Sequence, residues 1–177
     1  MSIQDIAAFA EILAAIGVLV SLIFVGLQVR QNTQAQRVLA VQSLAAAITA
    51  INVPGMESPA LGTALAKTTR DWHGASREER MIAHFFLFSL FKLLETAWYQ
   101  QRANTLDQTQ WAGWETLLLA YYHFPGVQKE WWPQRRNSYS PEFQAYLAAT
   151  SKPTGIGTLS DLFDDKEPEP AGASNDT

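Results

Sequence analysis

The stretch IGVLVSLIFVGLQVRQNTQAQR, residues 16–37, begins as an apolar run, ends as a polar one with arginines, and decides the fold. No charged residue lies in residues 12–29. As an α-helix with a rise of about 1.5 Å per residue, this segment spans roughly 27 Å, close to the ~30 Å hydrocarbon thickness of a bilayer. The sequence therefore predicts a transmembrane anchor. The alternative is a buried core helix of a soluble bundle.

The charges on either side of the apolar run predict its orientation. Asp5 and Glu11 precede the run, and Arg30 and Arg37 follow it. A cleaved signal peptide has basic residues before its apolar core and small residues at its cleavage site, so these flanks argue against one. Because cationic flanks stay on the cytoplasmic side, we expect a single-pass protein with its N-terminus outside and the bulk of its chain in the cytoplasm.

Small residues recur at intervals of three and four along one face of the anchor. In a bilayer such residues let two helix backbones approach closely enough for dispersion forces to hold them together. The face predicts contact with another membrane protein or with a second copy of this chain, and its members are Ala7, Ala10, Ala14, Gly17 and Ser21.

Composition excludes several classes of function. The chain has 177 residues, a net charge of -4 and no cysteine, which excludes thiol catalysis, disulfides and cysteine-bound metals. Residues 1–150 carry as many basic as acidic side chains, so the chain lacks the basic surface that binds nucleic acid. No phosphate-binding glycine loop, nucleophile elbow or zinc motif is present, and the three histidines lack metal-ligand spacing. We expect no cofactor and no metal.

The pattern along the chain predicts an all-α fold in four parts. No proline or glycine interrupts residues 27–53, so the helix is expected to leave the membrane as a stalk and to end at Pro54 and Gly55. No alternating pattern typical of strands follows. The predicted parts are a short N-terminus with the transmembrane anchor (1–30), a stalk helix (31–55), a helical bundle (56–150) and a disordered acidic tail (151–177).

Capping signals divide the predicted bundle into helices. Ser76 with Glu79 forms a capping box ahead of a long apolar helix, and Asp107 with Gln110 repeats the pattern. As a second membrane span the long helix is disfavoured by its charged residues. The expected helices cover residues 59–72, 76–102, 108–123, 126–134 (ended by Pro133) and 140–150.

One polar stripe follows the long helix at steps of three or four residues. If buried, a carboxylate beside a lysine and a tyrosine would be a candidate site for proton transfer. The alternative is a solvent edge or a structural ion pair. The stripe consists of His84, Lys92, Glu95, Tyr99 and Arg102.

Two further segments are candidates for contact. In the tail, LSDLF places Leu159, Leu162 and Phe163 at spacings that suit one helical turn docked in a groove; the alternative is a solubilising tail. Paired tryptophans followed by paired arginines are typical of a lipid headgroup interface, although tryptophan is also common core material. Together with the two arginines behind the anchor, the predicted lipid interface is Arg30, Arg37, Trp131, Trp132, Arg135 and Arg136.

Three segments carry a family resemblance: GLQVRQNTQAQR behind the anchor, LETAWYQQRANTLDQTQWAGW, and PGVQKEWWPQRRNSYSPEF. They resemble an uncharacterised family of small bacterial proteins, each with one N-terminal membrane helix and a cytoplasmic helical region. The resemblance covers about residues 6–147 and leaves the acidic tail out. It implies a protein of the bacterial inner membrane and transfers no reaction, ligand or catalytic residue.

These observations favour action by contact over catalysis. We expect a non-catalytic accessory or scaffolding subunit of a bacterial membrane complex, acting through helix contacts in the membrane and a helical docking surface in the cytoplasm. The alternative is a membrane-tethered enzyme or ligand-binding sensor with its site along the stripe that contains Glu95.

Overall fold

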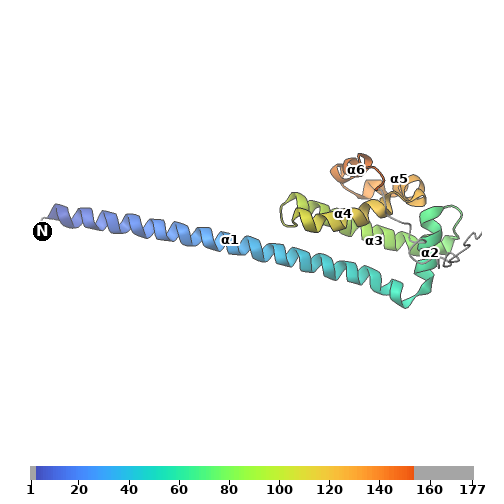
Figure 1. The fold of residues 1–177 in the computed structure, drawn as a ribbon, viewed down its shortest axis with the longest axis horizontal. Helices are drawn as coiled ribbons and strands as arrows, with labels where there is room; N and C mark the ends of the chain where they lie inside the picture. Colours follow the sequence, from blue (N-terminus) through green and yellow to red (C-terminus); the bar gives the residue numbers. More distant parts are fainter. Residues whose placement is uncertain (1–2, 154–177) are drawn as a thin grey trace, which may run out of the picture.

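The computed structural model describes residues 3–153, and every regular element in that range is a helix (Figure 1). One very long helix, α1 (Ile3–Glu57), projects far beyond a bundle of shorter helices that lies along its C-terminal part (Figure 1). The predicted all-α class is confirmed. The predicted tail lies outside the described residues from residue 154 onward.

The N-terminal half of α1 is covered by nothing in the described chain. Apolar side chains in residues 12–29 are strongly exposed; Leu22 and Ile23, for example, are 63% and 65% exposed. Two helices are long and apolar enough to cross a bilayer, the segment Glu11–Pro54 and Arg77–Arg102. The most apolar window of the first is entirely unburied, whereas half of the second is buried in the bundle. The apolar half of α1 is therefore not a core helix of its own bundle.

The C-terminal half of α1 is part of the bundle rather than a free stalk. Leu44 is only 2% exposed and belongs to the same core cluster as the buried leucines of the long helix that follows. Val41 and Ile48 pack against that cluster from the same face. At the beginning of this contact, Arg37 donates from Nε to the backbone oxygen of Asn104 over 3.1 Å. The segment predicted as a stalk is thus exposed at first and packed from about Arg37 onward.

The end of α1 differs from the prediction by less than one turn. Pro54 lies inside the helix, which continues to Glu57. A proline removes one hydrogen bond from the turn before it but does not prevent the residues after it from remaining helical. The backbone N–H of Ser58 then donates to the oxygen of Pro54 over 3.1 Å, which completes the last turn before the chain changes direction.

The next two helices form the centre of the bundle. Helix α2 (Pro59–Arg70) starts with a proline, whose missing N–H costs nothing at that position, although Ser58 makes no capping hydrogen bond with its side chain. Helix α3 (Arg77–Arg102) begins with the predicted capping box, which is confirmed: Ser76 and Glu79 exchange side chain to backbone hydrogen bonds of 3.2 and 2.8 Å.

The chain then returns along α3 as helix α4 (Gln108–Tyr122) (Figure 1). The turn between α3 and α4 places Asn104 in the left-handed region with φ 57°, a conformation that asparagine tolerates well. Asp107 caps α4 by accepting from the N–H of Gln110 over 2.9 Å, as predicted. This α3–α4 turn is the end of the bundle nearest to the apolar half of α1 (Figure 1).

Short helical turns complete the bundle. They are η1 (Val127–Trp131), α5 (Trp132–Arg135), η2 (Arg136–Ser138) and α6 (Pro141–Ala148). The expectation that Pro133 ends a helix is wrong, because the chain stays helical from η1 through α5 to η2, with this proline in the first turn of α5. Gly126 allows this segment to approach α2, since a Cβ there would collide with the backbone oxygen of Thr68.

Aromatic rings fill the core between α3 and the C-terminal turns. Phe91 lies with its ring centroid 5.3 Å from that of Trp131 and 5.6 Å from that of Trp132. Trp132 in turn contacts Tyr139 with the ring centroids 4.9 Å apart. All four side chains are buried. Tilted aromatic pairs of this kind add to the free energy gained from burial alone.

The packed half of α1 can be tested by truncating one side chain. Leu44→Ala is expected to lower the free energy of unfolding of the bundle by about 2–5 kcal/mol, because it leaves a cavity at a fully packed position. Leu39→Ala, at a residue 63% exposed on the same helix, is expected to change it by less than about 0.5 kcal/mol. All six tryptophans lie between residues 72 and 132, so tryptophan fluorescence during urea unfolding in a mild detergent reports on the bundle alone. Equal effects of the two substitutions would contradict this packing.

Candidate functional site

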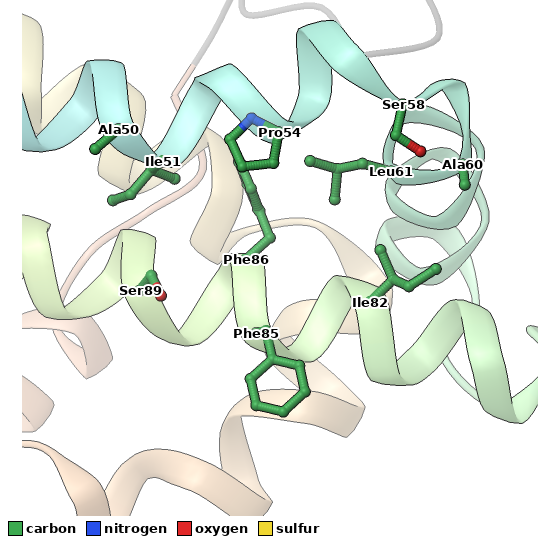
Figure 2. Close-up of a pocket in the computed structure, with 10 residues that line it drawn as sticks. All are labelled: Ala50, Ile51, Pro54, Ser58, Ala60, Leu61, Ile82, Phe85, Phe86 and Ser89. Atoms are coloured by element: carbon green, nitrogen blue, oxygen red, sulfur yellow. The ribbon is translucent and has the colours of Figure 1, made fainter.

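An apolar groove lies where α1 ends and α2 begins. Its volume is about 490 Å³, and three helices contribute to its walls (Figure 2). Ile51 and Pro54 come from α1, Leu61 comes from the start of α2, and Ile82 and Phe86 come from α3. The groove exists because the chain turns at Ser58 and α2 diverges from α1, so the two helices cannot close over α3 together.

The rim of the groove exposes large apolar side chains to solvent. Phe86 extends from α3 toward Pro54, whereas Phe85 leaves α3 on the side away from α1 (Figure 2). Phe85 is 66% exposed and Met81, one turn earlier on α3, is 55% exposed. Exposed apolar side chains that adjoin an apolar groove are typical of a surface that binds another protein.

The lining of the groove is almost wholly apolar. No titratable side chain is among its lining residues, whose polar members are Ser58 and Ser89. Pro54 has no N–H, so the backbone oxygen of Ala50 lacks its usual helical donor and can accept a hydrogen bond in the groove. A partner helix with apolar residues at three- and four-residue spacing would fill such a groove.

The predicted polar stripe on α3 centres on a structural ion pair. The Glu95 carboxylate accepts from Lys92 Nζ over 2.9 Å and from the backbone N–H of Ser140 over 2.7 Å. Lys92 also donates to the backbone oxygen of Ser138 and lies 4.4 Å above the ring of Tyr139. The pair therefore fastens α3 to the segment that leads into α6.

The ionisation of Glu95 agrees with this structural role. Burial acts to raise the pKa of the carboxyl group, but the hydrogen bonds from Ser140 and Lys92 outweigh it and leave the pKa below its ordinary value of 4.5. At neutral pH the group is therefore a carboxylate and holds no proton to transfer. A general acid or base is instead expected to have a pKa near the working pH.

The other members of the stripe have separate partners. His84 Nδ1 accepts from Trp131 Nε1 over 3.1 Å, and burial, aided by the charge of Arg135, lowers the pKa of His84. Tyr99 donates to Glu142 over 3.4 Å, and Arg102 lies 4.7 Å above the ring of Trp98. His84 and Glu95 are 11 residues apart on one helix, which is ~16 Å along its axis. The stripe shares a face but does not converge on one site.

The structure divides the predicted lipid interface into two groups. Trp131 and Trp132 are only 1% and 5% exposed, so their rings are core material and cannot lie among lipid headgroups in this fold. Arg135 and Arg136 are exposed, and Arg135 lies near His84, ~27 Å along α3 from the α3–α4 turn. The expected lipid contact of Trp131 and Trp132 is wrong, because both rings are buried in the core.

The remaining predicted contacts are only partly described. Ala14, Gly17 and Ser21 are exposed on α1, and nothing lies within 4 Å of a Cβ built at Gly17. The side chains of Ala7 and Ala10 lie outside the described part of the structure. The predicted docking segment of the tail, Leu159, Leu162 and Phe163, also lies outside the described residues.

The sequence did not predict the groove. Among residues 3–153 no group of histidines and acidic residues could hold a metal ion. The apolar residues of α3 cover most of its circumference. This pattern indicated a buried helix, but it did not show which turn of the helix remains exposed to solvent. Pro59 directly after Ser58 was the available signal, because it marks a sharp change of direction.

Comparison with models of protein families, with curated proteins and with solved structures found no match to this chain.

The structural role of Glu95 predicts a loss of stability on neutralisation. Glu95→Gln is expected to lower the free energy of unfolding by about 1–3 kcal/mol, because a buried charge-assisted hydrogen bond is lost and Lys92 loses its carboxylate partner. Glu57→Gln, at an exposed carboxylate, is expected to change it by less than about 0.5 kcal/mol. Urea unfolding followed by tryptophan fluorescence measures both.

The same pair gives a pH dependence with a defined sign. The pKa of Glu95 is lower in the folded state, so the stabilisation is fully present above its ordinary value of 4.5 and is lost as the pH falls below it. The stability difference between the wild type and Glu95→Gln should therefore be constant near neutral pH and shrink below about pH 4.5. A difference that grows on acidification would contradict the ion pair.

Proposed function

We propose that this protein is a non-catalytic accessory or scaffolding subunit of a bacterial membrane complex, anchored in the inner membrane by the N-terminal half of α1. One observation carries the proposal. A single uninterrupted helix, Ile3–Glu57, is apolar and uncovered in its first half and built into the core of a helical bundle in its second half. An uncovered apolar helix of this length suits a bilayer, and a helix shared with the bundle fixes the bundle relative to it.

The orientation of the anchor follows from its flanks. Arg30 and Arg37 after the apolar run favour a bundle on the cytoplasmic side and an N-terminus outside. From the end of the apolar run at Val29 to Ile51 in the groove is ~33 Å along α1. The proposed subunit therefore holds an apolar docking groove at a fixed distance from the membrane surface.

Two surfaces would serve contact in this proposal. Inside the bilayer, the small-residue face with Gly17 would pack against a second membrane helix. In the cytoplasm, the groove between Pro54 and Phe86 would receive a helix of a partner protein. The alternative of a tethered enzyme or sensor is not proposed, since the polar stripe has no shared pocket and Glu95 is engaged in a structural ion pair.

The membrane contact can be tested with two matched substitutions. Gly17→Leu should reduce the size of the complex in native gels, because the added side chain separates the two backbones. Gly26→Leu is the control: nine residues later it lies on the opposite side of the helix, and it too has nothing within 4 Å of its Cβ position. Membranes carrying either variant should retain the protein through a high-pH carbonate wash. Release of the wild type by that wash would refute the anchor, and equal effects of the two substitutions would refute the face.

The cytoplasmic contact can be tested at the rim of the groove. Phe85→Asp should abolish the retention of proteins that co-purify with the wild type after gentle detergent extraction, because a charge replaces an exposed apolar contact. The exposed residue Ala112 on α4 provides the control, and Ala112→Asp should retain the same proteins. Quantitative mass spectrometry of the co-purified proteins compares the three samples. An unchanged set with Phe85→Asp would exclude the groove as the docking surface.

A further inference from the structure

Besides the apolar groove, the structure has a polar hollow on α1, between the apolar run and the bundle. Its volume is about 520 Å³, and its lining residues are Arg30, Thr33, Gln34 and Arg37. These residues are three, four and seven positions apart and so share one face of the helix. Arg37 on this face donates from Nε to the oxygen of Asn104, so the face points toward the α3–α4 turn.

The position of the hollow matches the headgroup layer of a bilayer if α1 spans the membrane as proposed above. The apolar run ends at Val29, and Arg30 to Gln34 extend from ~1.5 to ~7.5 Å beyond it along the helix axis. Headgroups occupy roughly 5–7 Å on each side of the hydrocarbon core. Arg37 and the α3–α4 turn follow at ~12 Å, directly beneath this layer.

The side chains of the hollow supply donors and positive charge. The Thr33 hydroxyl donates to the oxygen of Val29 over 2.9 Å, so its proton is not available to a ligand. Among residues 3–153, Arg37 donates from Nε alone, to Asn104, so the four N–H groups of its two terminal nitrogens remain as donors for a ligand. Arg30 adds a second guanidinium, and the amide of Gln34 adds a neutral donor. Guanidinium groups bind phosphate oxygens with paired hydrogen bonds.

The α3–α4 turn carries a third cation at a similar level along α1, on the side of α3 that faces α6. Arg102 ends α3 two residues before Asn104, is exposed, and lies over the ring of Trp98. The ion pairs formed within residues 3–153 join Lys67 to Glu79, His73 to Glu130 and Lys92 to Glu95, so none of them neutralises these three arginines. Asp107 is the one carboxylate of the turn, and it caps α4.

We infer that the hollow of Arg30, Gln34 and Arg37 binds the phosphate headgroup of an anionic phospholipid of the leaflet that faces the bundle. The bundle then rests on the membrane with its α3–α4 turn, and the groove at the other end points away from the bilayer. This inference rests on the anchor of the proposed function and adds a ligand that the anchor alone does not require.

Native mass spectrometry of the full chain in detergent tests the site directly. Titration with phosphatidylglycerol should give bound lipid at concentrations where phosphatidylcholine gives none, because only the first carries a net charge. Replacing Arg30 and Arg37 by glutamine should weaken this binding, by roughly fivefold for each arginine. Arg135→Gln with Arg136→Gln removes the same charge from the far end and should leave binding unchanged.

Several outcomes would overturn the inference. Arg30→Gln alone serves as a second variant, because Arg30 makes no contact with the bundle that its loss could disturb; unchanged lipid binding in this variant refutes the site. If Arg135→Gln with Arg136→Gln weakens lipid binding equally, the lipid responds to the net charge of the protein and not to this site. Competition by soluble glycerol phosphate at similar concentrations would show a small-anion site instead of a lipid site.

The orientation of the bundle has its own readout. The chain has no cysteine, so Ala103→Cys on the α3–α4 turn and Met81→Cys near the start of α3 each accept a single dye. The two positions are ~33 Å apart along α3. Energy transfer to headgroup-labelled lipid in phosphatidylglycerol vesicles should be much stronger from residue 103. Equal energy transfer from the two positions, in a protein that stays in the membrane through a carbonate wash, would refute this inference but not the anchor. Release of the protein by the wash would refute the anchor.

Discussion

The packing of Leu44 and its neighbours against α3 is the contact on which the rest of the structure depends. It turns the second half of a 55-residue helix into a wall of the bundle core. A helix that left the membrane and ended in a loop would leave the bundle free to rotate. A helix that continues from the apolar half of α1 into the bundle core prevents this rotation. The direction of the apolar half therefore determines where every surface of the bundle points.

Two kinds of interaction then fix the rest of the bundle around α3. Apolar burial dominates: Leu87, Phe91 and Leu94 are fully buried, and the rings of Trp131 and Trp132 close the core from the C-terminal side. Polar contacts add direction at the edges. Glu95 accepts the N–H of Ser140 at the start of α6, so one carboxylate serves both as the partner of Lys92 and as an anchor for the last helix.

The two ends of the bundle differ in chemistry. The end with the α3–α4 turn carries Arg37 and Arg102 and lies next to the apolar half of α1. The opposite end carries the uncharged groove beside Pro54 with Phe85 at its rim. This arrangement follows from one fact of connectivity, the antiparallel return of α3 along α1, and it separates Arg37 and Arg102 from the apolar groove by nearly the length of the bundle.

The sequence by itself determined the local features of this protein. The charge-free run of residues 12–29 predicted a membrane anchor, which the described bundle leaves uncovered, and short-range pairs such as Ser76 with Glu79 and Asp107 with Gln110 predicted where helices begin. Such signals act over one or two turns, so they can be read without knowing the fold. Tertiary structure alone decided which residues meet across helices: that Trp131 is buried against His84 and Phe91, that Glu95 binds the Ser140 backbone, and that a groove stays open beside Pro54. These contacts join residues far apart in the chain, and an apolar or charged residue has the same local pattern whether it covers a core, contacts lipid or lines an open groove.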